Sequence, residues 1–169
     1  MHGAGRFFRY ALRAPLQKRP SCTALGNINR MTAGFLSIRA PNGPPDEDGV
    51  FRLEVEASND SFSARATTWC VDAAIAGLVE KLGEFPRGVP DEVMFKTGTP
   101  SDITLVFRTL RNTGQCGVLI VIKVPTESSH SLELEDSASF WVMFEPGDLN
   151  SFTKRLARLF ESGEATLGK

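Results

Sequence analysis

The sequence predicts an α+β protein in which a largely antiparallel sheet of about five to six strands carries two amphipathic helices. Three observations support this fold class. Apolar and polar residues alternate with a period of two in several short segments, and short turn sequences separate these segments. Two further segments, which follow Asp72 and Asp148, repeat their apolar residues with helical spacing. The expected order of elements is ββαββββα.

The first two strands are expected to form a hairpin. Residues 51–57 alternate strictly, with apolar side chains at 51, 53, 55 and 57 and charged ones between them. Residues 58–61, Ser-Asn-Asp-Ser, provide the turn. Residues 62–67 then alternate again and would place Phe62 and Ala64 on the inner side.

The period changes after this hairpin. Asp72 is a candidate N-cap of a helix, and Gly83 and Pro86 are expected to end it. One face of that helix is apolar and consists of Ile75, Leu78, Val79 and Leu82.

Four strands are expected next, at about 93–95, 103–110, 118–122 and 132–144. Residues 112–114 would turn the chain between the second and the third. Residues 118–122 are apolar on both sides, which predicts a central strand covered on both faces. Val106 is an apolar residue on the outer side of its strand, and Asp136 and Ser137 suggest a break or bulge in the last one.

The stretch FWVMFEPGDLNSFTKRLARLF, residues 140–160, joins that last strand to the second helix. Pro146 and Gly147 should stop the strand, Asp148 could cap the helix, and Gly163 should end it. The apolar face of this helix consists of Leu149, Phe152, Leu156, Leu159 and Phe160. Such a face needs a sheet to cover it, so we interpret the junction as one that closes the fold.

The chain is expected to contain one domain, residues 50–163, with a linker at 31–49 and a tail at 164–169. Residues 1–30 carry six of the nineteen Lys and Arg residues and no acid. Thirteen basic and twenty acidic residues remain in the rest of the chain, which is therefore acidic. The basic leader could be an extension upstream of a true start at Met31, a targeting segment of mitochondrial type, or an arm that touches membrane or nucleic acid.

Charge and cysteine content restrict the function. An acidic body repels phosphate backbones, so we expect no nucleic-acid binding through it and favour a basic protein partner. No apolar run is long enough to span a membrane. Cys22, Cys70 and Cys116 are far apart and in no metal-binding spacing, which suits a reducing cytoplasm. We interpret them as small buried residues, although a nucleophilic role is the alternative.

No motif for catalysis, for metal binding or for phosphate binding is present. His130 is the single histidine after residue 30, and no second ligand follows it at a usual metal-binding spacing. We therefore predict no catalytic residue, no cofactor and no metal. A surface histidine is the simpler interpretation of His130.

Paired glutamates are the first candidates for a binding site. Glu54 and Glu56 share one strand face, as do Glu133 and Glu135. Paired carboxylates could perform acid–base chemistry, but alternation alone also places such residues outward. We interpret the four as an acidic surface that suits a basic protein.

Tryptophans are the second candidates. Trp69 and Trp141 lie on the strand side opposite the main inward residues, as does Met143. They either pack under a helix or form an exposed aromatic patch that could anchor a partner.

The runs FRLEVEASNDSFSARATTWCVDAAIAGLVEKLGEFP and FEPGDLNSFTKRLARL resemble a group of small bacterial α+β domains, over about residues 49–162. Some similar small acidic proteins are immunity partners of bacterial toxins. The resemblance implies a bacterial cytoplasmic protein that begins at Met31, and it carries over no catalytic residue.

The leading functional hypothesis is a small acidic protein-binding module without enzymatic activity, of which an immunity-type inhibitor of a basic toxin is one form. The first alternative is a small-molecule-binding protein or enzyme with a pocket between sheet and helices. The second is a secretion-type chaperone.

Overall fold

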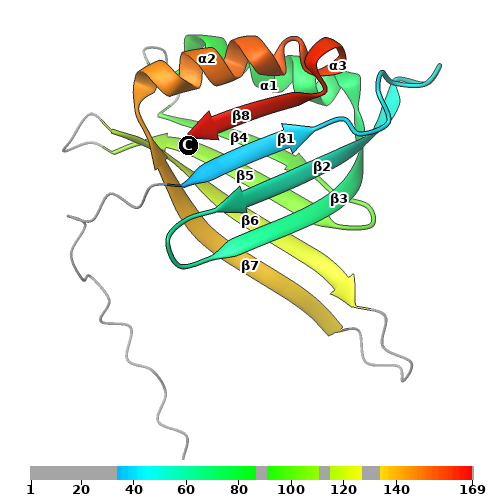
Figure 1. The fold of residues 1–169 in the computed structure, drawn as a ribbon, viewed down its shortest axis with the longest axis horizontal. Coiled ribbons are helices and arrows are strands. Elements are labelled where there is room, and N and C mark those ends of the chain that lie inside the picture. The colour runs from blue at the N-terminus through cyan, green and yellow to red at the C-terminus, as the bar shows by residue number, and fades with distance from the viewer. Residues whose placement is uncertain (1–33, 87–90, 111–114, 127–133, 169) are drawn as a thin grey trace, which may run out of the picture. The chain divides into compact units, whose positions relative to one another are not determined.

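The computed structural model describes residues 34–86, 91–110, 115–126 and 134–168, all within the unit that spans Met31–Lys169. This part of the chain forms eight strands and three helices (Figure 1). The strands are β1 (Phe35–Arg39), β2 (Val50–Ser58), β3 (Ser63–Val71), β4 (Glu92–Thr97), β5 (Asp102–Thr109), β6 (Cys116–Thr126), β7 (Leu134–Phe144) and β8 (Glu164–Gly168). The helices are α1 (Asp72–Glu84), α2 (Pro146–Leu156) and α3 (Leu159–Ser162).

The strands form two sheets of four. Sheet A has the order β3-β2-β1-β8 and sheet B the order β4-β5-β6-β7, and all neighbouring strands are antiparallel. The α+β class, the antiparallel pairing and the β2–β3 hairpin are thus confirmed. The prediction of one sheet in the order ββαββββα is wrong, because two strands and a short third helix were missed and the strands divide between two layers.

The two missed strands lie where the sequence suggested a linker and a tail. β1 pairs with β2 on one side and with β8 on the other, so that Leu36 lies opposite both Ala57 and Leu167. Leu36, Ala57 and Leu167 are completely buried. Each missed strand has only five residues, too few for a clear alternation to stand out. Their pairing also joins segments more than a hundred residues apart in the chain.

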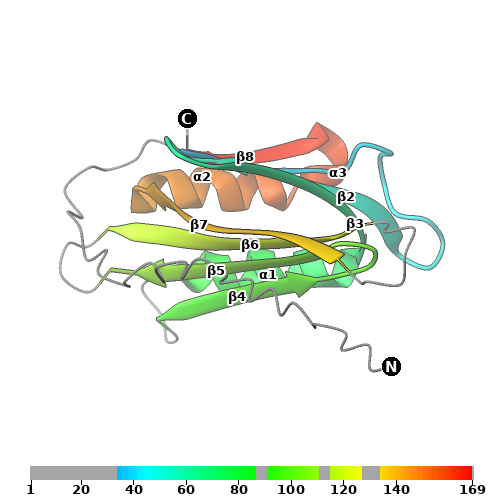
Figure 2. The same ribbon diagram turned by 90° about the horizontal axis from the view of Figure 1, so that it is seen from below.

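One hydrophobic core fills the space between the sheets and the helices. The inner faces of both sheets contribute alternate residues, as a sandwich requires. Helix α1 packs beside β4, and α2 and α3 pack beside β8, so the helices close one side of the sandwich (Figures 1 and 2). The predicted apolar helix faces supply that packing with Ile75, Leu78 and Leu82 of α1, Leu149, Phe152 and Leu156 of α2, and Leu159 of α3.

The helix ends differ from expectation at three places. Gly83 was expected to end the first helix but lies within α1, which ends at Glu84. Neither Asp72 nor Asp148 is an N-cap: Val71 and Glu145 hold these positions, and neither side chain caps its helix. Pro146 begins α2, where its fixed φ and missing N–H suit the first turn. Gly163 ends α3 with a left-handed φ of 76°, which confirms its predicted role.

The strand details also correct two expectations. β7 runs through Asp136 and Ser137 in continuous register with β6, so the predicted break is wrong. Phe62 is 61% exposed instead of facing inward. It belongs to the β2–β3 turn, in which the Asn59 side chain accepts hydrogen bonds from the backbone N–H groups of Ser61 and Phe62.

A test of β8 follows from its burial. Leu167→Ala should lower the free energy of unfolding by about 2–4 kcal/mol, because it leaves a cavity between β1 and the helices. Arg158→Ala, at an exposed position, should change it by less than about 0.5 kcal/mol. Urea unfolding of both variants measures the difference, and equal stability would show that residues 164–168 behave as a tail.

Candidate functional site

The outer face of sheet A holds an ion-pair network. Glu54 is only 8% exposed, and the Arg65 Nη2 and Arg39 Nη1 atoms lie 2.7 and 3.4 Å from its carboxylate oxygens. Glu56 lies 3.5 Å from the same Arg39 Nη1 atom. Both glutamates were expected on an exposed acidic surface, but the structure places them against arginines.

Strand pairing creates this network. Arg39 on β1 lies opposite Glu54 of β2 and also opposite Glu164 of β8. Its Nε atom is 3.2 Å from Glu164 Oε1, which also accepts a 2.7 Å hydrogen bond from the Ser37 hydroxyl. The hydrogen bond from Arg65 lowers the pKa of Glu54, and the one from Ser37 lowers the pKa of Glu164, in each case against the effect of burial.

Trp69 lies on this same outer face and is 53% exposed. Its backbone N–H donates to the Thr99 carbonyl, and its backbone carbonyl accepts from the Thr97 hydroxyl, so the backbone is held against the end of β4 and the loop that follows. Trp69 is thus an exposed side chain on a fixed strand. It lies on sheet A, whereas Trp141 lies on sheet B, so the two tryptophans do not form one patch.

The outer face of sheet B carries a continuous line of apolar side chains. Met94, Val106, Leu119 and Trp141 lie directly opposite one another across all four strands, and we call them the apolar row. Val106 is only 5% exposed although it points away from the core, whereas Met94 is 54% exposed. Leu119 and Trp141 are half-buried. Sheet A and α2 lie on the opposite side of sheet B (Figure 2).

Trp141 packs down onto the sheet beside the apolar row. A Cβ atom at Gly117 would come within 3.2 Å of the Trp141 ring and 3.0 Å of the Met143 sulfur. Both side chains therefore lie over the Gly117 backbone, where only glycine leaves room. Charged residues border the row, since Arg108 forms an ion pair with Glu92 on one flank and Lys96 is exposed on the other.

The sequence revealed the apolar residues of this surface but not their alignment into one row. Residues 118–122 were expected to be covered on both faces, but the core covers only Val118, Ile120 and Ile122. Leu119 and Val121 on the other face are half-buried. The signal was the excess of apolar residues at outward positions of β5, β6 and β7, and without the register these residues could not be aligned into one row.

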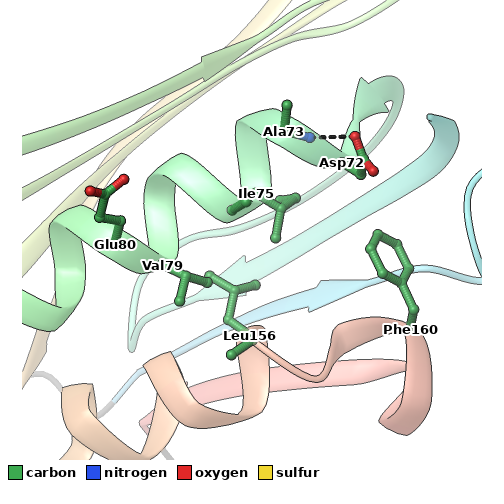
Figure 3. Close-up of a pocket in the computed structure, with 9 residues that line it drawn as sticks. Asp72, Ala73, Ile75, Val79, Glu80, Leu156 and Phe160 are labelled. Carbon is green, nitrogen blue, oxygen red and sulfur yellow. Dashed lines mark hydrogen bonds between the residues drawn. The ribbon is translucent and has the colours of Figure 1, made fainter. Parts of the chain in front are cut away.

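A groove of about 520 Å³ lies between the helices (Figure 3). Val79 of α1 and Leu156 of α2 approach each other in it, and Phe160 of α3 points toward the end where Asp72 lies. The chain leaves the helical path at Ala157 and Arg158, between α2 and α3, and Ala157 lines the groove. The groove is lined by Asp72, Ala73, Ile75, Ala76, Val79, Glu80, Leu156, Ala157 and Phe160.

A second hollow of about 660 Å³ lies where the end of α1 meets the start of α2, and is lined by residues that include Phe85, Pro86 and Pro146. Neither hollow lies between a sheet and the helices, where the sequence hypothesis placed a pocket. Trp69, Arg108 and Trp141 line neither of them.

The reactive side chains of the described residues are not assembled into a site. Cys70 and Cys116 are buried, and burial raises the pKa of both thiols, which keeps them protonated at neutral pH. No three His, Cys, Asp or Glu side chains in these ranges are placed to hold a metal ion together. Cys22, His130 and Glu133 and the side chain of Glu135 lie outside what the structure describes.

Among the same residues, no helix has the length and apolar character needed to cross a membrane. Comparison with protein-family models, with curated proteins and with solved structures finds no match to this chain.

The network on sheet A makes a prediction about stability. Glu54→Gln should lower the free energy of unfolding by about 1 kcal/mol at pH 7, because it removes a nearly buried charge from two arginines. The folded-state pKa of Glu54 is depressed, so its contribution is complete above the usual carboxylate pKa and disappears as the pH falls through the lower folded value.

The free energies of unfolding of the wild type and of Glu54→Gln should therefore differ by a constant amount from pH 7 to about 5. Below about 4 the two free energies should converge. Glu56→Gln is the matched control, since that side chain is more exposed and its ion pair is longer. If both variants lower the free energy of unfolding equally, or if the difference between the wild type and Glu54→Gln persists in acid, the stabilising role of the Glu54 carboxylate is wrong.

Proposed function

We propose that this protein is a protein-binding module whose contact surface is the outer face of sheet B. The observation that carries the proposal is the apolar row, which aligns four apolar side chains across four strands outside the core. Met94 is exposed and Leu119 and Trp141 are half-buried, so three of the four side chains still contact water. Apolar side chains that gather on a surface often mark an interaction site.

The composition of this face supports an interaction surface. Tryptophan, methionine and arginine are enriched at protein interfaces, and all three occur here as Trp141, Met94 and Arg108. The centre of the row, at Val106 and Leu119, is apolar, and the charged residues lie on its flanks. An apolar centre with a polar border is the usual anatomy of a binding surface.

Sheet A is the weaker candidate. Its outward acids Glu54 and Glu164 are already satisfied by arginine and serine, so a basic partner would have to compete with bonds within the protein. An immunity-type inhibitor of a basic toxin stays a narrower hypothesis, motivated by the acidic body and the sequence resemblance. A neighbouring toxin gene and a stoichiometric complex with its product would support it, and the absence of both would count against it.

The proposal predicts where a partner can be cross-linked. A photoreactive benzoylphenylalanine that replaces Met94 should give protein adducts in cells of the source organism, because the side chain stands at the end of the apolar row. The same group at Trp69 is a matched control, since the two side chains are 54% and 53% exposed but lie on different sheets. Mass spectrometry identifies the adducts.

Leu119→Lys, combined with the reagent at position 94, should remove the adducts by placing a charge in the centre of the row. A melting curve should first show that this variant folds. The absence of adducts from position 94, or equal yields of the same adducts from positions 94 and 69, would contradict the proposal.

Small-molecule binding is a second candidate, and the groove between the helices favours it. Its volume of about 520 Å³ is in the usual range for ligand sites, and most of its lining is apolar. The carboxylates that line it, Asp72 and Glu80, would favour an apolar ligand with a positive charge.

Naphthylmethylamine should therefore bind more tightly than naphthoate, which has a similar ring but the opposite charge. Ala157→Phe should abolish the binding by filling the groove, whereas Ser151→Phe adds the same ring at an exposed position of α2 that does not line the groove. Chemical-shift titration by NMR measures both affinities. Equal binding of the two probes, or no effect of Ala157→Phe, would exclude this site.

A further inference from the structure

We infer that a second copy of this chain covers the outer face of sheet B, through a two-fold axis that runs parallel to the apolar row. This inference rests on the proposed function, because it names the occupant of the same surface. In such a dimer the two B sheets stack face to face, and each residue of the row meets its own symmetry mate near the axis.

The register of sheet B places a second line of residues on each side of the apolar row. The Glu92 row contains Glu92, Arg108, Gly117 and Met143, and the Lys96 row contains Lys96, Thr104, Val121 and Ser139. A two-fold axis along the apolar row turns the Glu92 row of one copy onto the Lys96 row of the other. Lys96 of each protomer then faces Glu92 of its partner, so each of the two lysines gains a carboxylate neighbour while Glu92 keeps its ion pair with Arg108.

The other simple axis is less favourable. A two-fold axis parallel to the strands would place β4 over β7, so that Glu92 would face Met143 and Lys96 would face Ser139. Glu92 would keep its ion pair with Arg108, but Lys96 would gain no oppositely charged neighbour across the interface, and desolvation of a charge without such a partner is costly. Charge complementarity therefore selects the axis along the row.

The net charge of the face also allows two copies to meet. The register places three basic residues, Lys96, Arg108 and Lys123, and three acidic ones, Glu92, Asp102 and Glu135, at positions of this face, and Lys123 lies directly opposite Asp102 in the sheet. The acidic character of residues 31–169 is therefore not concentrated here. A strongly basic protein gains little long-range attraction from this face, whereas a second copy meets little repulsion.

Shape points to a flat occupant. Trp141 lies over Gly117, and Val106 is only 5% exposed, so neither side chain projects far from the sheet. The two hollows described above lie at the helices, away from this face. Twisted sheets stack on such faces at about 10 Å, with their strands rotated by about 30°.

The size of the face predicts a weak dimer. Four strands spaced by about 4.8 Å and a depth of three to five rows give a footprint on the order of 400–600 Å² per protomer. Stable complexes bury about 800 Å² per partner, and smaller interfaces tend to be transient. We therefore expect a dissociation constant in the micromolar range.

Sedimentation velocity of the full chain, from about 1 to 500 μM, tests for this dimer across the expected range. The wild type should pass from monomer to dimer. Leu119→Lys should stay monomeric at every concentration while it retains its fold, as near-native unfolding in urea would show. Trp69→Lys, an equally large change on sheet A, should dimerise like the wild type.

The axis is tested by exchanging charges. Lys96→Glu alone places two glutamates opposite each other, and Glu92→Lys alone places two lysines opposite each other, so each variant should dimerise at least about tenfold more weakly than the wild type. A mixture of the two variants should form a heterodimer about as stable as the wild-type dimer, because both contacts then become attractive. Native mass spectrometry separates heterodimers from homodimers.

Three results would overturn the inference. The wild type could remain monomeric at every concentration, or Leu119→Lys could dimerise as the wild type does. The third is a mixture of the two charge variants that forms heterodimers no more stable than the homodimer of either variant. Failure of the inference is distinguishable from failure of the proposed function. If position 94 cross-links to a different protein while the chain stays monomeric, the second copy is wrong and the binding surface stands. If no protein adduct forms and the chain stays monomeric, both are wrong.

Discussion

The pairing of β1 between β2 and β8 is the constraint on which the rest of this structure depends. It joins the two ends of the described chain and turns the β2–β3 hairpin into a four-stranded sheet. It also brings Arg39 between Glu54 and Glu164, and it places β8 beside α2 and α3. Leu36 and Ile38 are completely buried, so this small strand has a large share in the core.

The position of the helices explains why the two outer faces differ from the core. Helices that lie across a sheet would cover one of its faces, but here they close the side of the sandwich next to β4 and β8 (Figure 1). Each sheet therefore packs one face inward and leaves the other without a helix. Sheet A carries paired charges at the centre of its outer face and leaves Trp69 and Val71 exposed on its edge strand β3, whereas sheet B presents a row of apolar side chains across all four strands.

These two solutions have different consequences for function. A carboxylate that is already hydrogen bonded to arginine gains little from a new basic partner, since the old bonds must first be broken. An apolar side chain in contact with water gains from any partner that removes it from water. The interaction surface that we propose on sheet B therefore depends on the hydrophobic effect, even though charge is the more conspicuous property of the sequence.

The sequence by itself determined the fold class, the β2–β3 hairpin and the apolar faces of α1 and α2, because these depend on periodicity within one segment. It also showed that Trp141 and Met143 point away from the main inward side. Tertiary structure alone decided the rest. The strands 35–39 and 164–168 are too short to show a clear alternation of apolar and polar residues. The apolar row and the Arg39 network exist only through the register between strands. A shift of one residue in that register would reverse the faces, and no single segment records it.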